Sequence, residues 1–307
     1  MSKGYEIRAP YEKERAELFN IFYVCFPHAV NGFKQLEKNN RPLSDYLYGY
    51  EPRVMLMDGK IIANVSLVRY KIYLGGKVVP IGGIASVVTL PEYQRKGYAQ
   101  MLLQERFRNM QEEGTYLSIL MTELPWAYET MGFKIVPQDY RVVDLAEQKN
   151  NTVDPHIALT EDIAAANVIM PLYDEIAPTL DGAIKREPSY WQDYYFDGLT
   201  GMAGNGGPLL LYKDGGKLLG YARIHEESDR VLLSETVAKD WNPDILQKLV
   251  KAAMKTAVDK GFSKMVIGMQ ENHPLRKQLA AMGVKHKVER PEGMREVTML
   301  NVLAKLP

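Results

Sequence analysis

The chain has 307 residues, 46% of them hydrophobic and 25% charged, which is typical of a folded protein large enough for two domain cores. Lysine and arginine (38) balance aspartate and glutamate (38), so the net charge favours neither nucleic acid nor an anionic membrane as a partner. The single cysteine, Cys25, excludes an internal disulfide, and no apolar run reaches the length of a membrane span. The N-terminal segment lacks the apolar core of a secretory signal, so we expect a cytoplasmic protein.

The first half of the chain alternates strand-forming segments with glycine turns. Asp58 and Gly59 lie between two runs rich in Val, Ile and Leu, which predicts a β-hairpin because this dipeptide tolerates the positive φ of a tight turn. Residues 75–76 predict a second turn, and apolar spacing after Gly97 predicts a helix that ends at Gly114. The predicted elements are strands over 53–57, 61–74 and 77–90, a helix over 97–113, a strand over 116–122, a short helix over 126–131 and a closing strand after residue 133.

The second half repeats this order of elements. It predicts strands over 209–213, 217–225 and 231–237, a helix over 245–258, a strand over 264–269 and a short helix over 273–282. The hairpin glycine lies 73 residues before the glycine that follows the short helix in the first half (Gly59 to Gly132) and 68 residues before it in the second (Gly215 to Gly283). The sequence therefore predicts an α+β (α/β mixed sheet) fold made of one unit duplicated in tandem, with two unrelated α/β stretches as the alternative.

A polar segment separates the two halves. Residues 147–155 are polar and end in proline, which is typical of a linker. We therefore expect an N-terminal domain over 1–152 and a C-terminal domain over 153–307. The glycine-rich stretch 197–208 has no Gly-Lys-Ser/Thr ending and predicts a surface loop.

The junction over 87–99 is the segment most typical of a ligand site. It predicts a strand, a tight turn and a helix that begins near Gly97. Such a junction directs backbone N–H groups and the positive end of a helix dipole towards one point, where proteins hold diphosphates. Arg95 and Lys96 add positive charge, and Gly97 admits phosphate close to the backbone. The alternative is a charged turn that caps an ordinary helix.

Two ordered motifs in the first half resemble those of the GNAT acetyltransferase superfamily. Residues 94–99 (Gln-Arg-Lys-Gly-Tyr-Ala) are similar to its Gln/Arg-x-x-Gly-x-Gly/Ala signature, in the same strand-to-helix context. Residues 127–133 (Ala-Tyr-Glu-Thr-Met-Gly-Phe) are similar to its Tyr-x-x-x-Gly-Phe/Tyr element. With the duplication and residues 184–192, the chain resembles the Eis (enhanced intracellular survival) branch, in which a working GNAT unit is paired with a degenerate one.

The resemblance implies an acetyl-CoA site in the first unit. Tyr128 matches the general acid that protonates the departing CoA thiolate, a task suited to a phenol of pKa near 10, or else it is a core aromatic with a satisfied hydroxyl. Glu123 either flanks the acceptor or is a solvated acid at a strand end. The implied cofactor-binding residues are Val87, Val88 and Thr89 along the pantetheine arm, Arg95, Lys96, Gly97, Tyr98, Ala99 and Gln100 around the diphosphate, and Glu123 and Leu124 beside the thioester.

The second half lacks the cofactor turn. Its corresponding segment, 239–244, has no glycine, and Asp240 and Asp244 would repel phosphate. Asn242 is placed to cap a helix that starts at Pro243. We therefore expect one CoA site per chain, with the second unit as a wall of the acceptor pocket.

The predicted function is direct transfer of an acetyl group from acetyl-CoA to a primary amine, without a metal. The resemblance implies a small polyamine-like or aminoglycoside-like acceptor, or a lysine side chain, and a homo-oligomer as assembly. The general base is not evident, because 83–88 carries no acid. In longer Eis-like chains the C-terminal carboxylate of a third, sterol-carrier-like domain is the base; here the carboxylate of Pro307 either folds back or belongs to a frayed end. The alternative is a CoA-binding regulatory or scaffold protein without turnover.

For the remaining cysteine, histidine and aromatic side chains the sequence gives no clear sign of a catalytic or metal site. Cys25 lies in an apolar helical stretch and is expected in the core, and the histidines show no metal-ligand spacing. The tyrosines at 46, 48 and 50 and the aromatic cluster over 190–196 either pack in the core or line the acceptor pocket.

Overall fold

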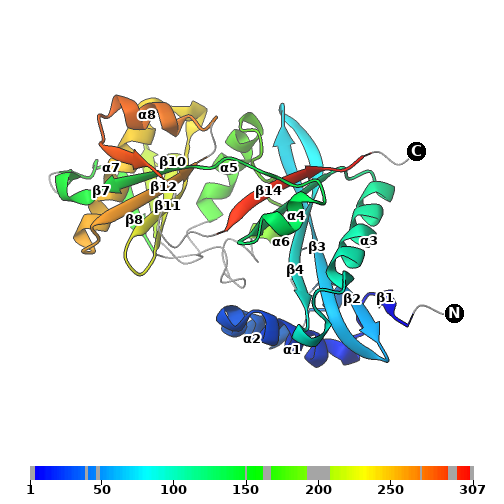
Figure 1. Ribbon diagram of the computed structural model, residues 1–307. Coiled ribbons are helices and arrows are strands. Elements are labelled where there is room, and N and C mark those ends of the chain that lie inside the picture. Colours follow the sequence, from blue (N-terminus) through cyan, green and yellow to red (C-terminus); the bar gives the residue numbers. More distant parts are fainter. Residues whose placement is uncertain are drawn as a thin grey trace.

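The computed structural model describes residues 4–38, 41–45, 49–148, 151–161, 167–191, 208–269, 272–289 and 296–304. Within these ranges the strands form two seven-stranded mixed sheets, and helices pack on them (Figure 1). This architecture confirms the predicted α+β class with tandem units.

The first sheet takes strands from both ends of the chain. In spatial order they are β1 (Glu6–Arg8), β2 (Tyr50–Met57), β3 (Lys60–Leu74), β4 (Lys77–Thr89), β5 (Leu117–Thr122), β14 (Val297–Val302) and β6 (Lys134–Ile135). Neighbours pair antiparallel except β4 and β5, which run parallel. The β2–β3 turn has positive φ at both Asp58 (48°) and Gly59 (79°), the backbone that an Asp-Gly dipeptide predicts.

Helices cover both faces of the first sheet. They are α1 (Arg15–Cys25), α2 (Val30–Lys38), α3 (Tyr98–Glu112) and α4 (Trp126–Glu129). Successive residues of a strand point to opposite faces: Val68 packs in the buried cluster of α1 and α2, and its neighbour Leu67 packs in the cluster of α3. The first sheet therefore separates two cores: one under α1 and α2, and one under α3, which we call the first core.

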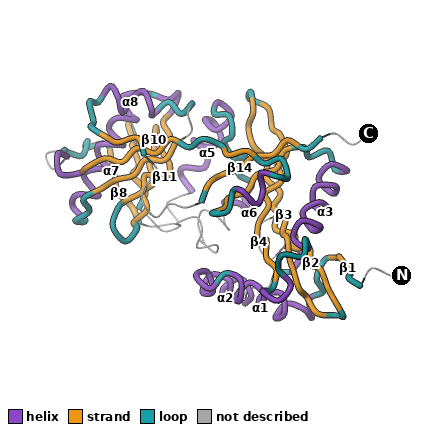
Figure 2. The backbone as a smooth tube through the Cα atoms, in the orientation of Figure 1, coloured by secondary structure: helices purple, strands orange, loops and turns teal. Residues whose placement is uncertain are grey.

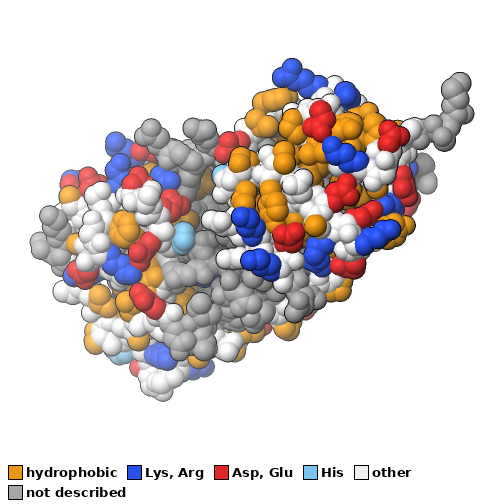
Figure 3. All heavy atoms as spheres, turned by 90° about the horizontal axis from the view of Figure 1, so that it is seen from below, with side chains coloured by type: hydrophobic (Ala, Val, Ile, Leu, Met, Phe, Trp, Pro, Cys, Tyr) orange, Lys and Arg blue, Asp and Glu red, His pale blue; other side chains and the backbone are white. Residues whose placement is uncertain are grey.

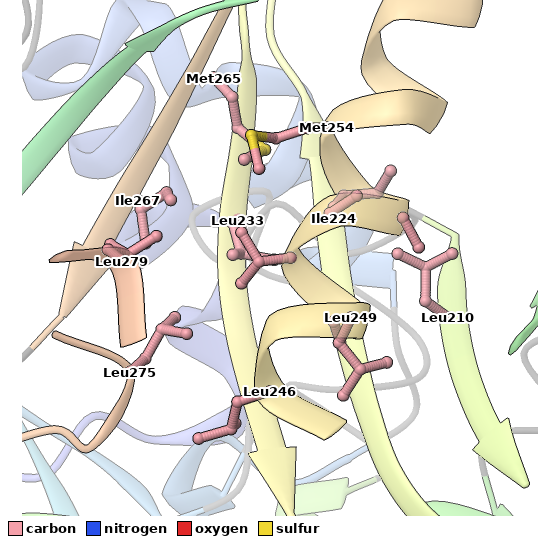
Figure 4. Packing of buried hydrophobic residues seen from close by; sticks show 14 of the residues in the cluster. Leu210, Ile224, Leu233, Leu246, Leu249, Met254, Met265, Ile267, Leu275 and Leu279 are labelled. Atoms are coloured by element: carbon pink, nitrogen blue, oxygen red, sulfur yellow. The ribbon is translucent and has the colours of Figure 1, made fainter. Parts of the chain in front are cut away.

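The second sheet has the same plan. Its strands, in spatial order, are β13 (His286–Val288), β7 (Asp139–Asp144), β12 (Lys264–Met269), β11 (Val231–Ala238), β10 (Lys217–Glu226), β9 (Leu209–Asp214) and β8 (Ile157–Thr160). The helices of this half are α5 (Met170–Ile176), α6 (Pro188–Tyr190), α7 (Pro243–Asp259) and α8 (Leu275–Ala281). The predicted helical period is confirmed, because Leu246 and Leu249 of α7 are fully buried in the cluster that contains Leu233 (Figure 4).

The two units exchange one strand. In the first sheet β14 lies between β5 and β6, and in the second β7 lies between the corresponding strands β12 and β13. Figure 2 shows β14 on the side of the molecule that holds β3 and β4. The predicted closing strand after residue 133 is present as β6, the last strand of the first sheet, but it is short. The chain then passes into the second sheet as β7, and residues 297–302 fill the position between β5 and β6. The domain boundary near residue 152 stays a prediction. β7, which precedes it in the chain, lies in the second sheet, and β14, which follows it, lies in the first.

A second contact joins the halves beside the β3–β4 hairpin. The Tyr73 N–H donates to the carbonyl of Ala183 at 2.8 Å, and the Lys185 N–H donates to the carbonyl of Lys71 at 2.8 Å. Ile184 thereby forms an antiparallel bridge with Ile72. The end of β3 that extends beyond β2 is thus covered by the second half.

The surface carries both signs of charge. On the face shown in Figure 3, basic and acidic side chains are interspersed among the described residues, in keeping with the balanced composition. No helix in the described ranges combines the length and apolarity needed to cross a bilayer.

We expect Met299→Ala to destabilise the protein by about 2–5 kcal/mol, because Met299 is fully buried in the first core and the change leaves a cavity. Denaturant unfolding measures the loss. Val302→Ala on the same strand is the control, since Val302 is 70% exposed and its truncation should change stability by less than about 0.5 kcal/mol. Equal effects of the two changes would contradict the placement of β14 in the first core.

Candidate active site

The two parallel strands of the first sheet are paired only briefly. In the described structure β4 and β5 pair at Gly82 with Ser118 and at Gly83 with Ile119. Past this point β4 continues to Thr89 and β5 to Thr122 without pairing to each other. The strands therefore splay, and the edge of β4 that faces the gap carries backbone N–H and C=O groups without a strand partner.

The two glycines at the start of the splay allow close packing. A Cβ at Gly82 would lie 2.4 Å from the methyl carbon of Met110 on α3, and one at Gly83 would lie 2.7 Å from the ring of Tyr70 on the opposite face. Both distances are too short for real contacts. The absence of side chains at Gly82 and Gly83 thus allows α3 and Tyr70 to pack closely on the sheet directly beside the gap.

A β-bulge turns the backbone of β4 at the gap. Between the pairs Asn64–Val88 and Ser66–Ala85, one residue of β3 opposes two residues of β4, and Ser86 has φ of 47°. The side chain of Asn64, which is fully buried, donates from Nδ2 to the Ser86 carbonyl at 2.9 Å. This hydrogen bond, worth about 0.5–1.5 kcal/mol net, stabilises the bulge, which changes the direction of the following N–H groups.

The predicted cofactor turn leads from the end of β4 to α3. Arg95 and Gly97 have positive φ, 62° and 80°, and Gly97 occupies the N-cap position without a side-chain cap. The first N–H groups of a helix have no partner within the helix, and an added Cβ at Gly97 would meet nothing within 4 Å. Gln94 braces the turn, because its Nε2 donates to the Thr89 carbonyl at 3.0 Å. The exposed turn therefore presents open N–H groups and positive charge, which suit an anion.

The end of β5 and α4 form the other side of the gap. Glu123 is exposed, and the Leu124 N–H donates to Thr122 Oγ1 at 3.0 Å. Tyr128 on α4 is partly buried against the first core, with its ring centroid 6.0 Å from that of Phe133. Burial raises the pKa of Tyr128, so its phenol stays protonated at neutral pH. Within the described ranges no residue hydrogen-bonds its hydroxyl.

The structure therefore brings the predicted residues to one end of the splay. The segment 87–89 ends β4, Glu123 and Leu124 follow β5, and the turn residues 95–100 begin α3. Their roles stay predictions. Pro307 lies outside the described residues; the last described residue, Ala304, accepts a hydrogen bond from Gln111 Nε2 at 2.6 Å, beside the end of α3 that lies away from the turn.

Other predicted side chains are packed. The Cys25 thiol lies 3.6 Å from the Thr89 carbonyl, and burial raises its pKa, which lowers its reactivity. Tyr50 and Trp191 are buried, whereas Tyr46, Tyr48 and the aromatic residues at 194–196 lie outside the described residues. Within the described ranges no group of three or more His, Cys, Asp or Glu side chains could hold a metal.

Sequence reasoning missed two asparagines. Asn64 and Asn301 are both buried and both bond backbone carbonyls of the site region. The available signal was a polar amide within an otherwise apolar strand segment, because such a group needs a buried partner. The identity of that partner depends on the tertiary structure.

In the second unit, the helix N-terminus that corresponds to that of α3 is covered by side chains. Asn242 caps α7 as predicted, accepting from the Asp244 and Ile245 N–H groups at 3.0 and 3.2 Å. Trp241 donates from Nε1 to Thr179 Oγ1 at 2.7 Å, and its ring lies 5.1 Å from that of His273. The N-terminus of α7 is therefore occupied by the protein's own groups, whereas that of α3 is open.

Residues 6–136 match the family model described as the acetyltransferase (GNAT) domain. No curated protein sequence matched the chain.

Solved structures match over both halves. A probable N-acyltransferase from Enterococcus faecalis V583 is 17% identical with a TM-score of 0.73, over 99% of this chain and 74% of that one. A GCN5-related N-acetyltransferase from Anabaena variabilis is 17% identical with a TM-score of 0.71, over 97% and 72%. Eis1 from Mycobacterium abscessus is 16% identical with a TM-score of 0.66, over 97% and 73%. At these identities the likeness shows the fold.

We expect the stability of the protein to depend on pH through His273, which packs beside Trp241 near the N-terminus of α7. Burial lowers the pKa of His273 to about 4, below its unfolded value of about 6.5. The unfolded chain therefore takes up a proton first, and stability should fall by up to about 3 kcal/mol as the pH drops from about 6.5 to about 4. Protonation of Nδ1 also removes the acceptor for the Leu275 N–H at 3.1 Å.

Chemical denaturation across this pH range measures the effect. His273→Gln is the matched control, because the amide keeps a polar side chain but does not titrate. If the free energy of unfolding falls with pH equally in the parent and in His273→Gln, His273 is not the source of the pH dependence.

Proposed function

We propose that the chain transfers the acetyl group of acetyl-CoA directly to a primary amine in a ternary complex. Residues 6–136 match the family model of the acetyltransferase (GNAT) domain. The family and the fold support an acyltransferase. One observation carries the finer proposal: the unpaired edge of β4 lies next to the uncapped N-terminus of α3.

The residues at the splay fit the parts of acetyl-CoA. When bound, acetyl-CoA supplies an activated acetyl thioester. Backbone groups of Val87, Val88 and Thr89 pair with the amides of the pantetheine arm, as a peptide adds to a sheet edge. The turn 95–100 holds the diphosphate through N–H groups and positive charge. Glu123 and Leu124 flank the thioester.

The chain's own groups supply the chemistry of transfer. The N–H groups of 87–89 stabilise the negative charge that develops on the thioester oxygen. As the amine nitrogen forms its bond to the carbonyl carbon and the carbon–sulfur bond breaks, Tyr128 donates its hydroxyl proton to the sulfur. The strand segment from Gly83 to Thr89 carries no acid, so the proton of the amine passes to water or to a carboxylate on another segment.

The second unit forms a wall of the acceptor site in this proposal. Its segment 181–185 lies along β3, and its own helix N-terminus is capped. The acceptor is a small polyamine-like or aminoglycoside-like molecule, or a lysine side chain, and the assembly is a homo-oligomer. A CoA-binding regulatory or scaffold protein is the second candidate, because β4 lacks an acid beside the gap.

We expect Gly97→Glu to weaken CoA binding at least about tenfold, or about 1.4 kcal/mol. The carboxylate repels the diphosphate, and φ of 80° is unfavourable for a side chain. Calorimetry with CoA measures the affinity. Gly114→Glu is the matched control, since Gly114 follows the other end of α3, has φ of 77° and also has open space at Cβ. Undiminished affinity in Gly97→Glu would overturn the assignment of the turn.

We expect Tyr128→Phe to lower thiol release from acetyl-CoA about a hundredfold, because the leaving thiolate loses its proton donor. The assay uses a panel of a polyamine, an aminoglycoside and a lysine peptide. Tyr212→Phe on β9 of the second sheet is the control and should keep the parental rate. CoA binding without thiol release from any amine would favour the regulatory protein instead.

A further inference from the structure

Asn301 connects the last strand of the chain to the turn after α4. It is buried on β14, and its Nδ2 donates to the Met131 carbonyl at 2.9 Å. A Cβ at Gly132 would lie 3.0 Å from Asn301 Oδ1, and Gly132 has φ of 93°. The glycine therefore allows the amide to pack directly against the turn.

This turn also holds Tyr128. The Tyr128 carbonyl accepts from the Met131 N–H at 2.9 Å and from the Phe133 N–H at 3.3 Å. The Phe133 ring is fully buried and meets the Tyr128 ring edge to face. The turn over 131–133 therefore contacts Tyr128 twice, through the backbone of Met131 and Phe133 and through the ring of Phe133.

Asn301 comes from the second half of the chain. The pairs from Val297 with Thr122 to Val302 with Leu117 fix β14 against β5, and Asn301 stands opposite Ser118. The fully buried Met299 anchors the same strand in the first core. The second half thus delivers the amide to a defined position beneath α4.

We propose that Asn301 is a positioning residue that sets the placement of the Tyr128 hydroxyl through the Met131–Phe133 turn. This inference rests on the proposed role of Tyr128 as the proton donor. Loss of the amide leaves the Met131 carbonyl without its donor and releases one side of the turn. A displacement of about 1 Å in a reacting group lowers the rate by up to about a hundredfold, without a change in CoA affinity.

A double-mutant cycle on the full chain separates this role from general stability. We expect Asn301→Ala to lower kcat for thiol release about tenfold and to leave KM for acetyl-CoA within about twofold. In the Tyr128→Phe background the same change should have no further effect on kcat, because no hydroxyl remains to be positioned. Asn301→Asp is the second variant, since it keeps the volume but removes the donor. Val302→Ala is the control on β14.

The outcomes distinguish this inference from the proposed function. An equal loss of kcat from Asn301→Ala in both backgrounds, or parental kcat in Asn301→Asp, would overturn the positioning role while Tyr128 kept its own. Parental turnover in Tyr128→Phe would overturn both. If Asn301→Ala fails to fold by circular dichroism, the cycle with Asn301→Asp decides in the same way.

Discussion

The site depends on one constraint, that β4 and β5 pair at two positions and then separate. A sheet edge normally satisfies its N–H and C=O groups with the next strand, and here the neighbouring strand turns away. The bulge at Ser86, held by Asn64, and the turn at Gly97 lie on the same stretch of chain. Together they place unsatisfied donors in an accessible gap, so a ligand rather than a strand can complete their hydrogen bonding.

The second unit shows what the same plan becomes when the gap is closed. There β11 and β12 pair at three positions before they separate, and Asn242, Trp241 and His273 fill the space around the helix N-terminus. The contrast lies in a few side chains, since the strand order of the two sheets is the same. An open gap and a packed region thus arise from one architecture.

Local signals in the sequence were sufficient for the central elements of each unit, from β2 to α4 and from β9 to α8, and for the turn at Gly97. The Asp-Gly hairpin, the period of α3 and α7 and the glycine at 97 each depend on neighbouring residues. The strand exchange could not be predicted, because the apolar alternation of β7 or β14 suits either sheet and the choice of partner is tertiary. The bond from Asn301 to Met131 spans 170 residues, and no local pattern indicates it. The general base that accepts the proton of the amine could not be predicted either, because the strand segment 83–89, where a carboxylate was sought, carries no acid.

The exchanged strand has a consequence for how the chain is made. Synthesis on the ribosome proceeds from the N-terminus, so the residues of β5 and β6 emerge long before those of β14. Until residue 302 has been translated, the nascent first sheet exposes an apolar β5 edge that its final neighbour has not yet covered. Pairings of such high sequence separation form slowly and leave edges open to aggregation. The first unit therefore passes through an interval during synthesis in which the edge of β5 has no strand partner.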